Sequence, residues 1–249
     1  MQMNRILLII LCGLPGLVAQ GQEAREVVRR ADEKMRGSSS FSEMTIEIVR
    51  PKWRREMQVK SWTRGTDYSL TLVTAPAKEK GNAFLKRGME IWSYNPAIER
   101  TIKLPPSMMM QSWMGTDMTN DDFVKQSSVV DDFTHRMVGE ESVSGQLCYK
   151  IELLPREDAA VVWGKLLLWI DKKEYMQMKT EFYDEDGYLV NTLVGSEVKL
   201  MGGKLLPTRM EMIPEENPGN KTVMTYTQLT FGQDQGEAFY TTQNMRKVR

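Results

Sequence analysis

Hydrophobic and polar residues alternate along most of this chain, and this two-residue period constrains the fold more than any other feature of the sequence. Near the start, Met44, Ile46 and Ile48 alternate with Thr45 and Glu47. Successive side chains of a strand point to opposite faces of a sheet, so this period predicts β-strands. Further predicted strands span Met57–Lys60, Tyr68–Thr74, Asn82–Arg87, Glu90–Asn95, Glu99–Leu104, Thr134–Glu140, Gln146–Leu154, Lys165–Asp171, Met176–Tyr183, Tyr188–Val194, Glu197–Leu200, Leu205–Ile213 and Thr222–Phe231.

Short turns rich in Gly, Pro, Asn and Asp separate these runs, which is typical of an antiparallel meander. One helix is predicted before them, over Ala24–Met35, where hydrophobic residues recur at helical spacing and Gly37 can end the helix. About a dozen strands with one apolar face must bury that face. The predicted fold is therefore mainly β, a strongly curved antiparallel sheet or unclosed β-barrel with an N-terminal helix.

The segment Leu104–Phe123 interrupts the alternation and is rich in methionine. Pro105-Pro106 can open a helix, and Gly115 would end or kink it. Thr119, with Asp122 three residues later, resembles a second helix start. We expect a helical lid over the sheet, and its candidate ligand-binding residues are Met108, Met109, Met110, Trp113, Met114 and Met118, of which Met110, Met114 and Met118 have helical spacing.

Three interpretations of this methionine cluster stay open. Methionine is unbranched and polarisable, so the cluster suits either a packed cover or a surface for apolar ligands of variable shape. Thioethers are also soft ligands for Cu(I), although the interval 108–118 holds no His or Cys.

The N-terminus predicts export. Arg5 precedes the apolar run Ile6–Leu14, and Ala19-Gln20-Gly21 has the small-x-small pattern of a cleavage site. The apolar run is about half of the ~20 residues needed to span a bilayer. We expect a signal peptide at residues 1–21 and a single exported domain at residues 22–249.

Several classes of function are disfavoured. Lys plus Arg and Asp plus Glu both total 33, so no global charge attracts nucleic acid. His135 is the only histidine, and both it and Cys148 lie in predicted strands, which disfavours a nucleophile with its base or a zinc site. No glycine pattern resembles a nucleotide-binding loop. The sequence thus predicts a protein that is not an enzyme, with no cofactor and no metal.

Specific residues also carry a family resemblance. The chain has, in order, the signal peptide, the helix Ala24–Met35, strands from Phe41, the phrase Trp92–Pro96 and the segment from Ile102 to Asp122. In this order and in the Gly115–Asp122 pattern, the sequence resembles the LolA-like periplasmic lipoprotein-carrier superfamily, particularly its longer branch of outer membrane lipoprotein-sorting proteins. The resemblance implies an unclosed β-barrel with helices over its mouth and an apolar cavity that shields acyl chains.

The leading hypothesis is therefore a monomeric periplasmic carrier that binds acyl chains of lipoproteins or other lipids for transfer toward the outer membrane. The alternative is a non-enzymatic envelope sensor or interaction module, and either protein could work beside an inner-membrane transporter. A one-residue slip in register exchanges the two faces of a strand. With that ambiguity, the expected cavity residues are Met44, Ile46, Ile48, Leu70, Leu72, Trp92 and Trp169.

Overall fold

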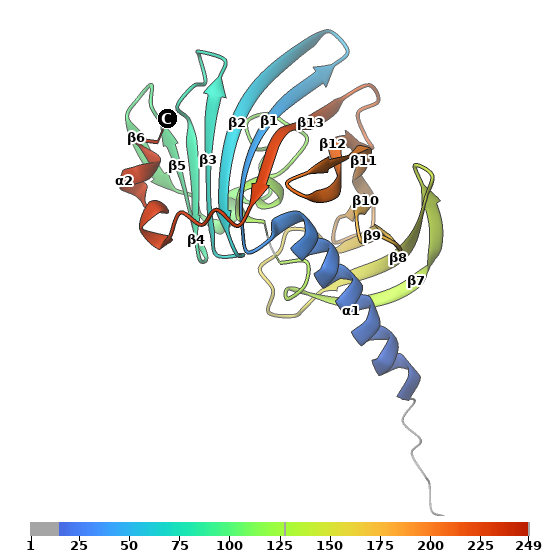
Figure 1. The fold of residues 1–249 in the computed structure, drawn as a ribbon. Coiled ribbons are helices and arrows are strands. Elements are labelled where there is room, and N and C mark those ends of the chain that lie inside the picture. The colour runs from blue at the N-terminus through green and yellow to red at the C-terminus, as the bar shows by residue number, and fades with distance from the viewer. Residues whose placement is uncertain (1–14, 127, 249) are drawn as a thin grey trace, which may run out of the picture.

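The computed structural model describes residues 15–126 and 128–248 of the chain (Figure 1). The signal-peptide prediction for residues 1–21 falls largely outside this part and stays a prediction. The N-terminal helix α1 spans Pro15–Arg36 and is thus longer than the predicted helix. It ends where the sequence indicated, since Gly37 adopts φ +64° and its N–H donates to the Glu33 carbonyl at 2.8 Å. Within the described residues, no helix is both long and apolar enough to cross a membrane.

In the described part of the chain, thirteen strands follow α1 and form a single sheet. They are β1 (Ser39–Arg50), β2 (Trp53–Arg64), β3 (Tyr68–Ala75), β4 (Ala83–Arg87), β5 (Glu90–Asn95), β6 (Arg100–Lys103), β7 (Phe133–Val143), β8 (Gln146–Pro155), β9 (Lys165–Asp171), β10 (Gln177–Tyr183), β11 (Leu189–Met201), β12 (Lys204–Pro214) and β13 (Lys221–Phe231). A short helix, α2 (Thr242–Met245), ends the described chain beside β4 (Figure 1).

The strands are ordered β6-β5-β4-β3-β2-β1-β13-β12-β11-β10-β9-β8-β7, and the neighbours pair antiparallel. The two halves of the chain meet where β1 pairs with β13. Strands β6 and β7 lie at opposite edges, so the sheet does not close into a barrel. The predicted fold class, a mainly β protein with an unclosed antiparallel sheet and an N-terminal helix, is confirmed.

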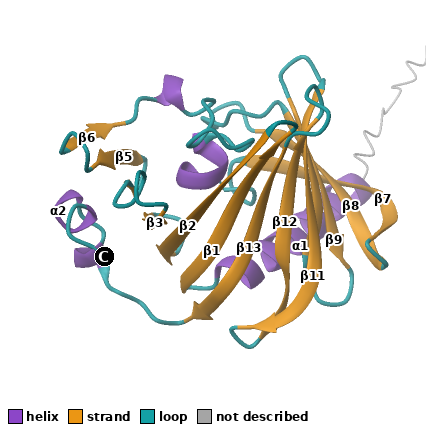
Figure 2. Cartoon of the chain, turned by 90° about the horizontal axis from the view of Figure 1, so that it is seen from above, coloured by secondary structure: helices purple, strands orange, loops and turns teal. Residues whose placement is uncertain are grey.

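One face of the sheet carries the main hydrophobic core, and we call it the inner face. Helix α1 packs against it, and Figure 2 shows this helix crossing the strands. Ala24, Val27, Val28 and Ala31 are the buried residues of α1 in this core. The opposite, outer face holds two smaller clusters, one beneath α2 and one on β8–β10.

The predicted cavity residues divide between these faces. Met44, Ile46 and Ile48 lie on the inner face and are buried in its core, and their contact with a ligand stays a prediction. The others do not take the expected inner face: Leu70, Leu72 and Trp92 pack on the outer face with Tyr240 and Met245, and Trp169 packs on the outer face with Cys148. On β3 the residues that alternate with Leu70 and Leu72 are Ser69 and Thr71, and these polar residues take the inner face.

The expected helical lid is also only partly formed. The segment from residue 104 to residue 126, which we call the lid segment, contains a 3-10 turn at Pro106–Met108 and a π-helical turn at Asp121–Lys125. Between them Met114 and Gly115 adopt positive φ values of +49° and +77°, which interrupt any continuous helix. The spacing of Met110, Met114 and Met118 therefore does not form one helical face.

One close backbone approach fixes the loop that precedes β9. A Cβ atom at Gly164 would lie 2.3 Å from the carbonyl oxygen of Asp184. We expect Gly164→Ala to lower the free energy of unfolding by about 3 kcal/mol, because backbone atoms would have to move. Urea unfolding measures this. Gly145→Ala is the comparison, because its Cβ would meet no atom within 4 Å and only the left-handed backbone cost of about 1 kcal/mol remains. Equal losses would contradict the prediction.

Candidate functional site

A cavity of about 320 Å³ lies between the inner face, α1 and the lid segment. Its volume is within the roughly 300–1,000 Å³ typical of small-molecule sites. One part of its lining is rich in methionine and aromatic residues, namely Met44, Met118, Phe123, Phe133, Trp163, Phe182, Met212, Met224 and Tyr226. Such side chains adapt to apolar ligands of different shape.

The predicted lid residues take different positions around this cavity. Only Met118 lines it, while Trp113 is fully buried and stacks on Phe123 with ring centroids 3.9 Å apart. Met109 is buried in the inner core, and Met108 and Met114 pack against that core. Met110 is 53% exposed. The structure thus distributes the methionines between core, cavity and solvent, which disfavours the Cu(I) interpretation.

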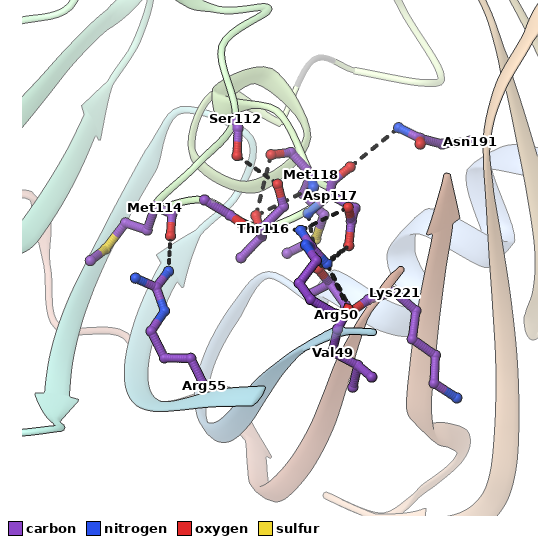
Figure 3. Close-up of polar contacts among 12 residues, drawn as sticks. Val49, Arg50, Arg55, Ser112, Met114, Thr116, Asp117, Met118, Asn191 and Lys221 are labelled. Atoms are coloured by element: carbon purple, nitrogen blue, oxygen red, sulfur yellow. Dashed lines mark hydrogen bonds and ion pairs between the residues drawn. The ribbon is translucent and has the colours of Figure 1, made fainter. Parts of the chain in front are cut away.

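Asp117 fixes the middle of the lid segment to the sheet (Figure 3). The Arg50 guanidinium donates to both carboxylate oxygens, at 2.9 and 3.0 Å. The Thr222 hydroxyl donates to Oδ2 at 2.7 Å, and the Asp117 N–H lies 2.9 Å from the same hydroxyl oxygen. Asn191 adds a bond to the Asp117 carbonyl at 3.2 Å. A charge-assisted, bidentate pair of this kind is among the stronger polar contacts.

A second arginine holds the adjacent turn. Arg55 donates to the Met114 carbonyl (Figure 3). It also pairs with Glu79 at 2.9 Å. Both arginines flank the β1–β2 hairpin, far from the lid segment in sequence. Sequence reasoning missed them because charged residues at hairpin ends are common and carry no signal of a distant partner.

The π-helical turn begins as the sequence indicated. The Thr119 N–H donates to Asp122 at 2.8 Å, and the Asp122 N–H donates to the Thr119 hydroxyl at 3.1 Å. The indole of Trp163 donates to the other Asp122 oxygen at 2.8 Å. Burial raises the pKa of Asp122, against these hydrogen bonds. Asp122 therefore acts as a structural acceptor beside the cavity.

The other part of the inner face, near the C-terminal end of α1, is polar. Two consecutive cross-strand rows from β1 to β4 consist almost entirely of hydroxyl residues, before the rows become apolar at Met44. The first row contains Ser40, Thr63, Ser69 and Lys86, and the second contains Ser42, Ser61, Thr71 and Phe84. Ser40, Ser42, Ser61, Thr63 and Thr71 line the cavity. The cavity therefore has a polar end and an apolar end.

Lys86 ends the first polar row and is only 9% exposed. Within residues 15–126 and 128–248, the structure shows no hydrogen bond or ion pair to its ammonium. Burial, followed by the positive charge of Arg36, lowers the pKa of Lys86 to about 8. Arg36 itself pairs with Asp32 at 3.0 Å, and Lys125 pairs with Asp121 at 3.0 Å. Lys86 is thus an additional cation beside two ion pairs.

A second pocket, of about 700 Å³, lies on the outer face between β1–β3 and the end of the chain. Its lining includes Lys60, Lys80, Tyr94 and Arg246. Although this pocket is larger, the inner cavity is the better candidate for an apolar ligand because it is covered by the lid segment and lined by methionine and aromatic side chains.

His135 and Cys148, the residues considered for catalysis, lie where their side chains are partly or fully buried in the fold. The Nε2–H of His135 donates a 2.7 Å hydrogen bond to the Val129 carbonyl, and burial lowers the pKa of this histidine. Burial raises the pKa of Cys148 to about 11, on the outer face. In the part of the chain that the structure describes, no group of His, Cys, Asp or Glu could hold a metal ion.

Comparisons with known proteins agree with this architecture. A family model described as "Uncharacterized protein" matches residues 65–247. The chain belongs to that family. No curated protein matches the sequence.

Solved structures show the same fold. A DUF1329 family protein from Desulfovibrio piger matches with a TM-score of 0.82 and 23% identity over 91% of this chain and 99% of that one. An outer membrane lipoprotein-sorting protein domain from Vibrio parahaemolyticus matches at 0.79 and 22% identity, over 91% and 99%. A LolA superfamily protein from Nitrosomonas europaea matches at 0.76 and 23% identity, over 88% and 98%. The LolA-like fold implied by the sequence resemblance is confirmed.

The Asp117 contact predicts a measurable stability effect. We expect Asp117→Asn to lower the free energy of unfolding by about 3 kcal/mol, because Arg50 would keep a buried charge without its counter-ion. Urea unfolding and limited proteolysis of the lid segment measure this. In a double-mutant cycle, Arg50→Met with Asp117→Asn should cost less than the sum of the single changes. Additive losses would contradict a direct interaction.

Replacing Lys86 should stabilise the fold, in contrast to replacing Asp117. We expect Lys86→Met to raise the free energy of unfolding at pH 7, by up to about 3 kcal/mol, because the folded state disfavours the charged ammonium. The unfolded chain binds this proton more tightly, so the gain should shrink as pH rises from about 8 to 10.5. Urea unfolding across this range tests the prediction, and a gain that does not depend on pH would contradict the charge-based cause.

Proposed function

We propose that this protein is a non-enzymatic periplasmic carrier that binds the acyl chains of lipoproteins or other lipids in the inner-face cavity. The observation that supports it most directly is the methionine-rich and aromatic lining beneath the lid segment. Each buried methylene contributes about 0.8 kcal/mol, so a modest cavity suffices for useful affinity. The names of the structural relatives, outer membrane lipoprotein-sorting and LolA superfamily, point the same way.

In this proposal the lid segment controls access to the cavity. Its contacts with the sheet combine apolar packing at Trp113 with the polar contacts at Asp117 and Met114. Release of the ligand would require local opening of this segment while the antiparallel sheet remains folded. A segment with little regular structure between its two short turns is suited to such opening, since local stability varies across a fold.

Leu193 offers a sharp test because it lines the cavity and is only half-buried. We expect Leu193→Glu to weaken retention of a fluorescent fatty-acyl probe by at least about tenfold, since a carboxylate would face the acyl chain. Probe binding and thermal unfolding are measured on the same sample, because the proposal requires the variant to stay folded.

Leu200→Glu is the matched control, on the same strand β11 and 72% exposed. Its probe affinity should stay within about twofold of the unmodified protein. Unchanged affinity in a folded Leu193→Glu variant would overturn the placement of the acyl chain in this cavity. Absence of probe binding by the unmodified protein would overturn the carrier proposal itself.

A further inference from the structure

The polar end of the inner cavity is unlike a hydrophobic core or an acyl-chain pocket. Two neighbouring rows place buried hydroxyl groups on the inner face, and some satisfy one another: the Ser40 and Thr63 hydroxyls are 2.6 Å apart, and those of Ser61 and Thr71 are 3.1 Å apart. Burying hydroxyl groups gives little stability even when they are paired. Their concentration at one end of a cavity indicates that this end accommodates a polar group.

Lys86 indicates the charge of that group. Lys86 lies on the inner face in register with Ser69 and is 9% exposed. It borders the cavity rather than lining it, beside the lining residues Arg36 and Asp121, and the structure shows no hydrogen-bonded acceptor for its ammonium among the described residues. Partial burial without a counter-ion in contact disfavours its charged form, as the lowered pKa of Lys86 indicates. A bound anion would supply the missing acceptor.

We propose that the polar end of the cavity binds the phosphate of a lipid headgroup, with Lys86 as its cationic partner and the acyl chains directed toward Met44 and Met118. This inference rests on the proposed carrier function and specifies its ligand as an anionic phospholipid rather than a neutral acylglycerol. The serine and threonine hydroxyls of the two rows supply hydrogen-bond donors for the headgroup, and the in-register order of the rows gives the ligand a direction.

The three cations of this region, Lys86, Arg36 and Lys125, are equal in number to the carboxylates of Asp32, Asp67 and Asp121, but among the described residues only two of the cations have a carboxylate in contact. Arg36 of α1 and Lys125 of the π-helical turn contribute positive charge, while Asp67 of the β2–β3 turn and Asp121 contribute negative charge. Arg36 and Lys125 already have carboxylate partners in Asp32 and Asp121, and Asp67 forms no ion pair with Lys86 within the described part of the chain. Lys86 has no carboxylate in contact in this part of the chain, so its ammonium could pair with a phosphate bound beside it.

The test compares two lipids with the same acyl chains. Dioleoylphosphatidylglycerol and dioleoylglycerol each displace a neutral fluorescent acyl probe from the protein, and the ratio of their half-displacement concentrations gives the headgroup preference. We expect the unmodified protein to prefer the phosphatidylglycerol by at least about tenfold, and Lys86→Met to reduce this preference to about twofold or less. Lys86→Arg should retain most of it, since the charge remains.

Lys60→Met is the matched control. Lys60 lies on β2 in the same part of the sheet but lines the outer pocket. The preference should survive this change, and its loss would place the headgroup in the outer pocket and overturn the inference. An equal response to both lipids in the unmodified protein, or a preference that persists in Lys86→Met, would also overturn it.

Two further results distinguish the headgroup site from a failure of acyl-chain binding and from a site for free phosphate. If neither lipid displaces the probe, the acyl-chain proposal fails and this inference fails with it, whereas displacement by both without preference rejects only the headgroup site. Calorimetric binding of inorganic phosphate as tightly as the lipid would identify a free-anion site and overturn the lipid assignment.

The preference should also depend on pH. Lys86 carries its proton below about pH 8 in the empty protein, and a bound phosphate would raise that pKa. We therefore expect the preference for phosphatidylglycerol to be constant near pH 7 and to fall at pH values above 8. A preference unchanged up to pH 10.5 would contradict the role of the Lys86 charge.

Discussion

An open antiparallel sheet with apolar residues on both faces must be covered by parts of the chain that are not strands, and this requirement organises the molecule. The sheet is not closed, because β6 and β7 lie at its two edges. Helix α1 and the lid segment therefore cover the inner face, and α2 with the last residues covers part of the outer face. The cavity lies where the inner cover does not fill the curve of the sheet.

The lid segment is held less by secondary structure than by a few specific contacts. Asp117 connects it to β1, β11 and β13 through Arg50, Asn191 and Thr222. A cover attached in this way can open by losing a few contacts together, whereas a helix packed along its whole length would open only by losing extended apolar contact. The irregular backbone at Met114 and Gly115 is thus compatible with a cover that moves.

The alternation of the strands predicted the architecture well, but not the face taken by every strand. Met44, Ile46 and Ile48 do lie on the inner face, and α1 ends before Gly37. The alternation failed on β3, because Leu70 and Leu72 were assumed to face the cavity while the inner positions belong to Ser69 and Thr71. An apolar residue shows which face of a strand points to the inner core only where the other face is exposed to solvent. On β3 both faces are buried, so the pattern does not distinguish them. The Asp117 contacts were also unpredictable, since their partners are brought together only by the folded sheet.

The wrong face predicted for Leu70 and Leu72 also indicates a part of the sheet whose residues are not arranged for packing alone. A chain selected only for stability would place its hydroxyl residues and Lys86 on the outer surface and its leucines inside, which is the arrangement that the alternation suggested. Instead, the inner face changes from hydroxyl groups to the apolar side chains of Met44, Val59 and Val73 within three consecutive cross-strand rows. Proteins retain such unfavourable arrangements chiefly at functional sites, where the cost in the empty state is offset when a ligand binds. The polar rows are therefore a second indication of a ligand, independent of the methionine-rich lining, because buried hydroxyl groups add little to the stability of an ordinary core.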